Sequence, residues 1–189
     1  MGTESGAIER TERTKPLSAR AERKLVREAQ RGSREALTDL YAAHWRRAHR
    51  AAYLVVHDGA AAEDVAQDAF LAAIVALDRF DRRRPFGPWL HRIVVNRAID
   101  WARREELRRS AGDPDERHAA DPPAETIGED VMEALAQLPV EQRAVVVLRY
   151  LLDYTPGEVA RMLDLPRGTV NSRLRRALDR LGGMLGEES

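Results

Sequence analysis

Apolar residues recur with the 3.6-residue period of an α-helix in two blocks of this chain, and no stretch alternates with the two-residue period of a strand. The blocks are separated by the acidic residues 110–128, where prolines and glycines interrupt any helix. We therefore predict an all-α fold of two small helical domains, residues 21–109 and 129–186, joined by a flexible linker. Residues 1–20 are polar, with almost nothing to bury, and predict a disordered tail.

The composition excludes several classes of function. The chain has no cysteine, so it can form neither disulfides nor thiolate metal sites. Its five histidines lack metal-ligand spacing, and neither a glycine-rich phosphate loop nor a nucleophile elbow is present. No apolar run approaches the roughly 20 residues that span a membrane, and the N-terminus lacks the apolar core of a secretion signal. We expect no catalytic residue, no metal, no cofactor and a cytoplasmic location.

The C-terminal block has the layout of a helix-turn-helix. Thr155, Pro156 and Glu158 form a capping-box pattern that predicts a helix to about Leu163. A turn at residues 164–166 follows, and a final helix is predicted from Arg167 to Leu181, ended by two glycines. The side chains predicted to form its inward seam are Leu163, Leu165, Val170, Leu174 and Leu178.

The outward face of this last helix is polar and basic. Arginine can form bidentate bonds to guanine and asparagine to adenine, while a helix N-terminus suits a phosphate. The alternative is an ordinary surface helix that carries arginines, but the turn, seam and basic face together favour DNA binding. The candidate DNA-binding residues are Thr169, Asn171, Ser172, Arg173, Arg175 and Arg176.

The N-terminal block contains a helix, predicted over about residues 61–77, that carries no lysine or arginine. Its apolar stripe is predicted to be Val65, Ala69, Phe70, Ala73, Ile74 and Leu77. Its opposite face carries acidic and amide side chains, chiefly Asp64, Gln67 and Asp68. Such a face repels DNA and suits a basic protein partner, although a solvated face is the alternative.

A basic, aromatic loop follows over residues 80–88, and a further helix is predicted from Trp89 to about Arg109. Aromatic rings beside arginines suit single-stranded nucleic acid, because unpaired bases stack on rings. The alternative for Phe86 and Trp89 is core packing, which we expect to account for most of Trp89.

Two stretches of the chain resemble the extracytoplasmic-function (group 4) sigma factors of the sigma-70 family. One is Leu135-Ala136-Gln137-Leu138-Pro139 together with Gly168-Thr169-Val170-Asn171-Ser172-Arg173-Leu174-Arg175-Arg176-Ala177. The other is Ala62-Glu63-Asp64-Val65-Ala66-Gln67-Asp68-Ala69-Phe70, followed by Trp89-Leu90-His91-Arg92-Ile93-Val94-Val95-Asn96-Arg97. Asn171, where lysine or arginine is common, and Pro156-Gly157 depart from the family pattern and leave the promoter sequence open.

The resemblance implies a factor that directs core RNA polymerase to promoters and promotes strand opening. The C-terminal domain would read the promoter element near −35, and the acidic helix face, Asp64, Gln67 and Asp68, would dock on polymerase. Many members of the family are held by an anti-sigma factor. The residues implied to bind the −10 element are Phe80, Arg82, Arg83, Arg84, Phe86, Asn96, Arg97 and Arg103.

The alternative function is a stand-alone helix-turn-helix repressor or activator that binds duplex DNA without polymerase. Such a protein would need a dimerisation or ligand domain. The first block shows neither a receiver-like strand pattern nor an obvious pocket, so the sigma-factor hypothesis is preferred.

Overall fold

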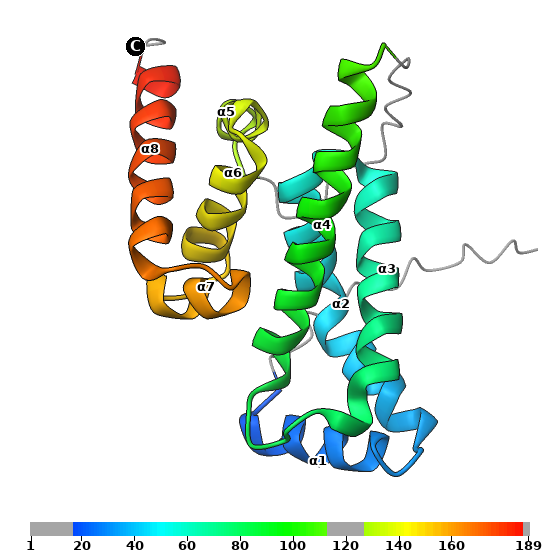
Figure 1. Cartoon of the computed structure of the whole chain (residues 1–189). Coiled ribbons are helices and arrows are strands. Elements are labelled where there is room, and N and C mark those ends of the chain that lie inside the picture. The colour runs from blue at the N-terminus through cyan, green and yellow to red at the C-terminus, as the bar shows by residue number, and fades with distance from the viewer. Residues whose placement is uncertain (1–16, 113–126, 187–189) are drawn as a thin grey trace, which may run out of the picture.

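The computed structural model describes residues 17–112 and 127–186, and every regular element within these ranges is a helix (Figure 1). This confirms the predicted all-α class. Most of the predicted tail and linker lies outside the described residues. The tail prediction extends two residues too far, because Ser18 already accepts a bond from the Ala21 amide and caps a helix that begins at Ala19.

The first helical unit contains four α-helices and a short 3₁₀ turn. Helices α2 (Arg34–Val56), α3 (Gly59–Ala76) and α4 (Phe86–Ser110) pack side by side, and α1 (Ala19–Ala29) crosses one end of them (Figure 1). The turn η1 (Leu77–Arg79) follows α3. Ser33 and Asp58 cap α2 and α3 through their side-chain oxygens, a role that short polar side chains often take at helix N-termini. The core between these helices is built largely from alanine and valine, and it includes the fully buried Leu90.

The second unit contains α5 (Glu129–Gln137), α6 (Val140–Val146), the π-helical segment η2 (Val147–Leu151), α7 (Pro156–Leu163) and α8 (Arg167–Gly186). The predicted capping box is present at the start of α7: the Glu158 amide donates to Thr155, and the Glu158 carboxylate accepts from the Thr155 amide. Asp164 adopts a left-handed conformation (φ 53°) and makes the tight turn into α8. The helix-turn-helix layout is confirmed.

Two predicted helix limits are wrong. Helix α4 begins at Phe86 rather than Trp89, because Pro88 falls in the first turn, where no amide proton is required. Helix α8 continues through both glycines to Gly186, because Leu181 is buried and Met184 packs on the core, which outweighs the cost of about 1 kcal/mol for each glycine. The helix that begins after Pro139 ends at Leu151, and its last turn, η2, is π-helical.

Two residues assigned to buried stripes are partly exposed. Leu178 is 43% exposed, because a step of four residues rotates about 40° further than one helical turn. The buried line of α8 is Val170, Leu174, Ala177 and Leu181. Ile74 of α3 is 45% exposed, at the edge of the stripe that faces α2 and α4.

Candidate nucleic-acid interface

The outer face of α8 is open to solvent. Asn171, Arg175 and Arg176 are exposed, while the opposite side of the helix is buried in the second unit. Thr169 and Ser172 are half-buried, and the Ser172 hydroxyl donates to the Thr169 carbonyl (3.0 Å). The three exposed side chains therefore form a preformed polar and basic surface of a kind that fits DNA.

Arg173 differs from its neighbours on α8. It is half-buried and lies near Glu141 of α6. Although burial acts to raise the pKa of Glu141, hydrogen bonding and the positive charges of Arg103 and Arg173 hold that pKa below its usual value. Arg173 therefore lies on the flank of the candidate DNA surface, beside Glu141 of the same helical unit.

The loop before α4 presents arginines but not aromatic rings. Arg82, Arg83 and Arg84 are exposed, in a turn where Asp81 accepts from the Arg83 amide (3.0 Å). Phe80 and Phe86 were predicted to bind the −10 element, yet they are only 7% and 4% exposed. The stacking expected of these rings is not supported by this conformation.

Their burial has a physical reason in the aromatic cluster at the end of the bundle. Phe80 lies 4.5 Å from the half-buried Trp89, and Phe86 lies 5.5 Å from the same ring, both measured between ring centroids. Phe86 also contacts His44 of α2. Burying three large rings at the foot of α4 removes more apolar area from water than presenting them on the loop.

Asn96 and Arg103 of α4 face the second unit. The Asn96 amide nitrogen donates to the Met162 carbonyl of α7 (3.3 Å). The Arg103 guanidinium pairs with the Glu141 carboxylate at 2.9 Å. Arg97 points elsewhere and pairs with Asp68 of α3 at 3.8 Å, with both side chains largely exposed. The predicted −10 residues are thus divided between an open loop, the buried aromatic cluster, an open helix face and two residues bonded to the second unit, of which Arg103 is still exposed.

The contact between the units has a buried polar centre that sequence analysis did not single out. His91 of α4 shares a 2.7 Å hydrogen bond between its Nδ1 and the hydroxyl of Tyr154. Burial, helped by the nearby charges of Arg47 and His44, lowers the pKa of His91 to about 3. Burial likewise raises the pKa of Tyr154 to about 12. Both groups are therefore neutral at pH 7.

The acidic face of α3 is exposed at Asp64, Gln67 and Asp68. The same line along the helix continues into Leu71 and Val75, which are 61% and 86% exposed. An acidic stretch thus adjoins an uncovered apolar stretch on one helix, a combination typical of protein interfaces. The sequence analysis left Leu71 and Val75 out of the buried stripe but did not assign them to the outer face, so the apolar part of that face was missed.

Comparison with known proteins matches the two helical units to two families. Residues 40–108 match Sigma-70 region 2, and residues 128–181 match Sigma-70 region 4. The chain is 40% identical over 156 residues to the ECF RNA polymerase sigma factor SigM of Mycobacterium tuberculosis, covering 82% of this chain and 80% of SigM. The chain belongs to the ECF family of RNA polymerase sigma factors.

Further relatives agree with this membership. The ECF RNA polymerase sigma factor SigW of Bacillus subtilis is 27% identical over 84% of this chain and 94% of SigW. Among solved structures, CnrH in complex with the cytosolic domain of CnrY has a TM-score of 0.67 and 29% identity, covering 91% of this chain and 100% of that one. RpoE of Bartonella quintana shares the fold, with a TM-score of 0.67 and 24% identity over 79% of this chain and 96% of that chain.

As an ECF sigma factor, the protein directs core RNA polymerase to specific promoters and promotes strand opening there, so polymerase and promoter DNA are its partners. The stand-alone regulator is not favoured, because both sigma regions are present in order. Within the described ranges, no helix is long and apolar enough to cross a membrane. The same residues contain no cluster of histidine, aspartate and glutamate that could hold a metal ion.

Proposed function

We propose that this sigma factor reads the −35 element with the outer face of α8. The observation that carries this assignment is that Asn171, Arg175 and Arg176 are exposed on a helix whose opposite side is buried. Thr169 and Ser172, near the helix N-terminus, are suited to position a phosphate. Arg173 is half-buried near Glu141 of the same unit and contributes from the flank of this face.

The proposed polymerase-docking surface is the outer face of α3. Asp64, Gln67 and Asp68 supply the polar part, and Leu71 and Val75 supply apolar area to bury. The absence of lysine and arginine from α3 supports a basic protein partner over DNA, since like charges repel phosphates. This surface is separate from the contact between the two helical units. Polymerase can therefore bind it while the two units remain in contact with each other.

The −10 element is proposed to bind in two stages. Arg82, Arg83 and Arg84 are exposed and can meet phosphates at once, and the exposed Arg97 can do so by leaving its pair with Asp68. Asn96, half-buried against Met162, can reach DNA only after it leaves the second unit, whereas the exposed Arg103 has only to exchange its pair with Glu141 for a phosphate. Phe80 and Phe86 hold the loop against the bundle through the aromatic cluster, rather than stacking on bases.

The remaining proposals concern regulation, cellular location and catalytic activity. An anti-sigma factor is a proposed partner, supported by the likeness to CnrH, which was solved with the cytosolic domain of CnrY. We also propose that the protein acts in the cytoplasm beside polymerase and has no catalytic activity of its own.

The test is run-off transcription with core RNA polymerase on promoters selected by the wild-type holoenzyme from a random-sequence library. Transcripts should require both the sigma factor and polymerase, and a duplex with the −35 element scrambled should lose most of them. The free protein should bind the same duplex weakly, because each base contact supplies only about 1–3 kcal/mol. Tight, sequence-specific binding by the free protein without any stimulation of polymerase would contradict the proposal.

A further inference from the structure

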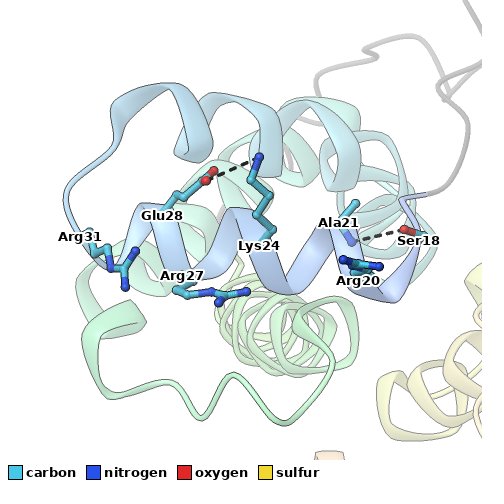
Figure 2. A pocket seen from close by; sticks show the side chains of 7 residues that line it. All are labelled: Ser18, Arg20, Ala21, Lys24, Arg27, Glu28 and Arg31. Carbon is cyan, nitrogen blue, oxygen red and sulfur yellow. Dashed lines mark hydrogen bonds and ion pairs between the residues drawn. The ribbon is translucent and has the colours of Figure 1, made fainter.

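The N-terminal helix α1 carries a row of cations on the side that faces away from the core. Arg20, Lys24, Arg27 and Arg31 follow one another at steps of four, three and four residues, with Arg31 in the turn after the helix. These steps keep successive side chains on one face. All four are exposed, and they line a shallow hollow together with Ser18, Ala21 and Glu28 (Figure 2).

The row is not neutralised by its own surroundings. Lys24 lies 3.7 Å from Glu28, an exposed i, i+4 pair. Within the described part of the chain, no ion pair involves Arg20, Arg27 or Arg31. The buried side of α1 is supplied by Val26 and Ala29, so the arginines contribute nothing to the core. The chain has no net charge overall, and this face is therefore a local concentration of positive charge.

The basic loop before α4 is fastened along α1 at both of its ends. At its start, the Gln30 amide donates to the carbonyls of Leu77 and Phe80, each at 2.9 Å. At its end, the Phe86 amide donates to the Glu22 carboxylate (3.1 Å). The loop therefore runs beside the helix in the opposite direction, as Figure 2 also shows.

This fastening places two sets of cations next to each other. The arginines of the loop, Arg82, Arg83 and Arg84, are exposed like those of α1. The distance along α1 from Arg20 to Arg31 is about 16 Å at 1.5 Å per residue, which matches about five base pairs at 3.4 Å each. We propose that Arg20, Arg27 and Arg31, the α1 arginines, bind backbone phosphates of promoter DNA on the flank of the segment that the loop engages.

This inference rests on the proposed role of the loop, and it adds a surface outside the residues matched by Sigma-70 region 2. Phosphate binding needs positive charge rather than a particular donor geometry, so the contact should be independent of sequence and sensitive to salt. An acidic surface of polymerase is the competing occupant of the same cations.

The test compares three variants of the full chain, each assembled with core polymerase on a selected promoter. They are the triple variant Arg20→Ala, Arg27→Ala, Arg31→Ala, the corresponding triple lysine variant, and the control Arg104→Ala, Arg108→Ala, Arg109→Ala. The control removes the same charge from exposed positions near the far end of α4 (Figure 1). Promoter affinity is measured from 50 to 200 mM salt, and binding to core polymerase is measured separately.

The alanine variant should lower the slope of log affinity against log salt by about two to three units, at 0.7–0.9 for each phosphate. Its affinity defect should therefore shrink by about 20- to 40-fold over that salt range. The lysine variant and the control should keep the wild-type slope, and all variants should bind core polymerase normally.

Three results would overturn the inference. An unchanged slope in the alanine variant would show that the α1 arginines do not meet phosphates. Loss of core binding would assign the face to polymerase, and a lysine variant as defective as the alanine variant would require specific guanidinium recognition. Failure of the wild-type holoenzyme to initiate would instead refute the proposed function, so the two failures are distinguishable.

Discussion

The two surfaces proposed to read DNA bases differ in their availability. The outer face of α8 is exposed, whereas Asn96 and Arg103 of α4 are bonded to Met162 and Glu141 of the other helical unit. The contact between the two units thus engages the polar groups of Asn96 and Arg103 and leaves the outer face of α8 open. This difference suggests an order of events, in which −35 duplex binding precedes contact of Asn96 with the −10 strand.

The largest effect should come from preventing polymerase binding, on which the contact of Asn96 with the −10 strand is proposed to depend. Asp64→Arg with Asp68→Arg should reduce transcription by at least about 100-fold, because like charges across an interface cost several kcal/mol. Binding of the free chain to −35 duplex should not change. Run-off transcription and co-purification with core polymerase measure the two outcomes.

Glu35→Arg with Asp39→Arg provides a matched control, since both are exposed on α2 and change the charge by the same amount. That variant should transcribe normally. Retention of core polymerase by the Asp64 and Asp68 variant would refute the docking role of α3.

The outer face of α8 should contribute equally to −35 binding in the free chain and in the holoenzyme. Arg175→Ala and Arg176→Ala should each weaken −35 binding, and a base-reading arginine should lose roughly 1–3 kcal/mol mainly on the preferred sequence. Because α8 is already exposed, the loss should be similar with and without polymerase. Gel shifts on preferred and scrambled duplexes measure it, and normal use of the −35 element by both variants would show that the face is wrongly assigned.

The pH dependence of the contact between the two units should trace to His91. Its pKa is about 3 in the structure, below an unfolded value of about 6.5. The native state therefore binds fewer protons between these values, so its stability is complete above about pH 6.5 and is lost as the pH falls. At pH 5 the loss should be about 2 kcal/mol, at about 1.4 kcal/mol for each pH unit.

Urea unfolding of the wild type and of His91→Leu at pH 7 and pH 5 tests this expectation. Burial also lowers the pKa of His49, but that group is present in both proteins and cancels in the comparison. Equal pH dependence in the two proteins would show that His91 does not stay buried and neutral in solution.

The contact of Asn96 with the −10 strand should matter only after polymerase binds. Asn96→Ala should leave duplex binding by the free chain unchanged and reduce open-complex formation by up to about tenfold, the value of a hydrogen bond of 0.5–1.5 kcal/mol. Permanganate reactivity of thymines in the bubble reports this step. A template already melted across −10 should relieve a melting defect, whereas a lost base preference should persist there. Normal thymine reactivity on duplex promoter would remove Asn96 from strand opening.

The smallest effect should come from loosening the contact itself. Glu141→Gln weakens the pair with Arg103, an interaction between partly exposed groups that is worth about 0.2–1 kcal/mol. The open population should rise by up to about fivefold, which would increase the distance between fluorophores on α4 and α8. Asp130→Gln on α5, exposed and without an ion pair in the described ranges, serves as the control. An unchanged distance distribution would show that the pair does not hold the units together.

The sequence by itself determined the helices, their caps and the helix-turn-helix, because these depend on residues within one or two turns of each other. Ser33, Asp58 and the Thr155–Glu158 box lie beside the backbone groups that they satisfy. Periodicity likewise placed Asn171, Arg175 and Arg176, which are proposed to read bases, on the outer face of α8. The sigma-factor family also followed from local motifs in the right order.

Only the tertiary structure decided which predicted site residues are free. His91 and Tyr154 are 63 positions apart in the sequence, and Asn96 donates a hydrogen bond to Met162, which is 66 positions away. No local period records such pairs, because they arise from packing one helical unit against the other. The same holds for Phe80 and Phe86, whose burial depends on Trp89 and on α1 and α2 around them. Local interactions determine where the helices form, while packing between distant parts of the chain determines which helix faces reach solvent.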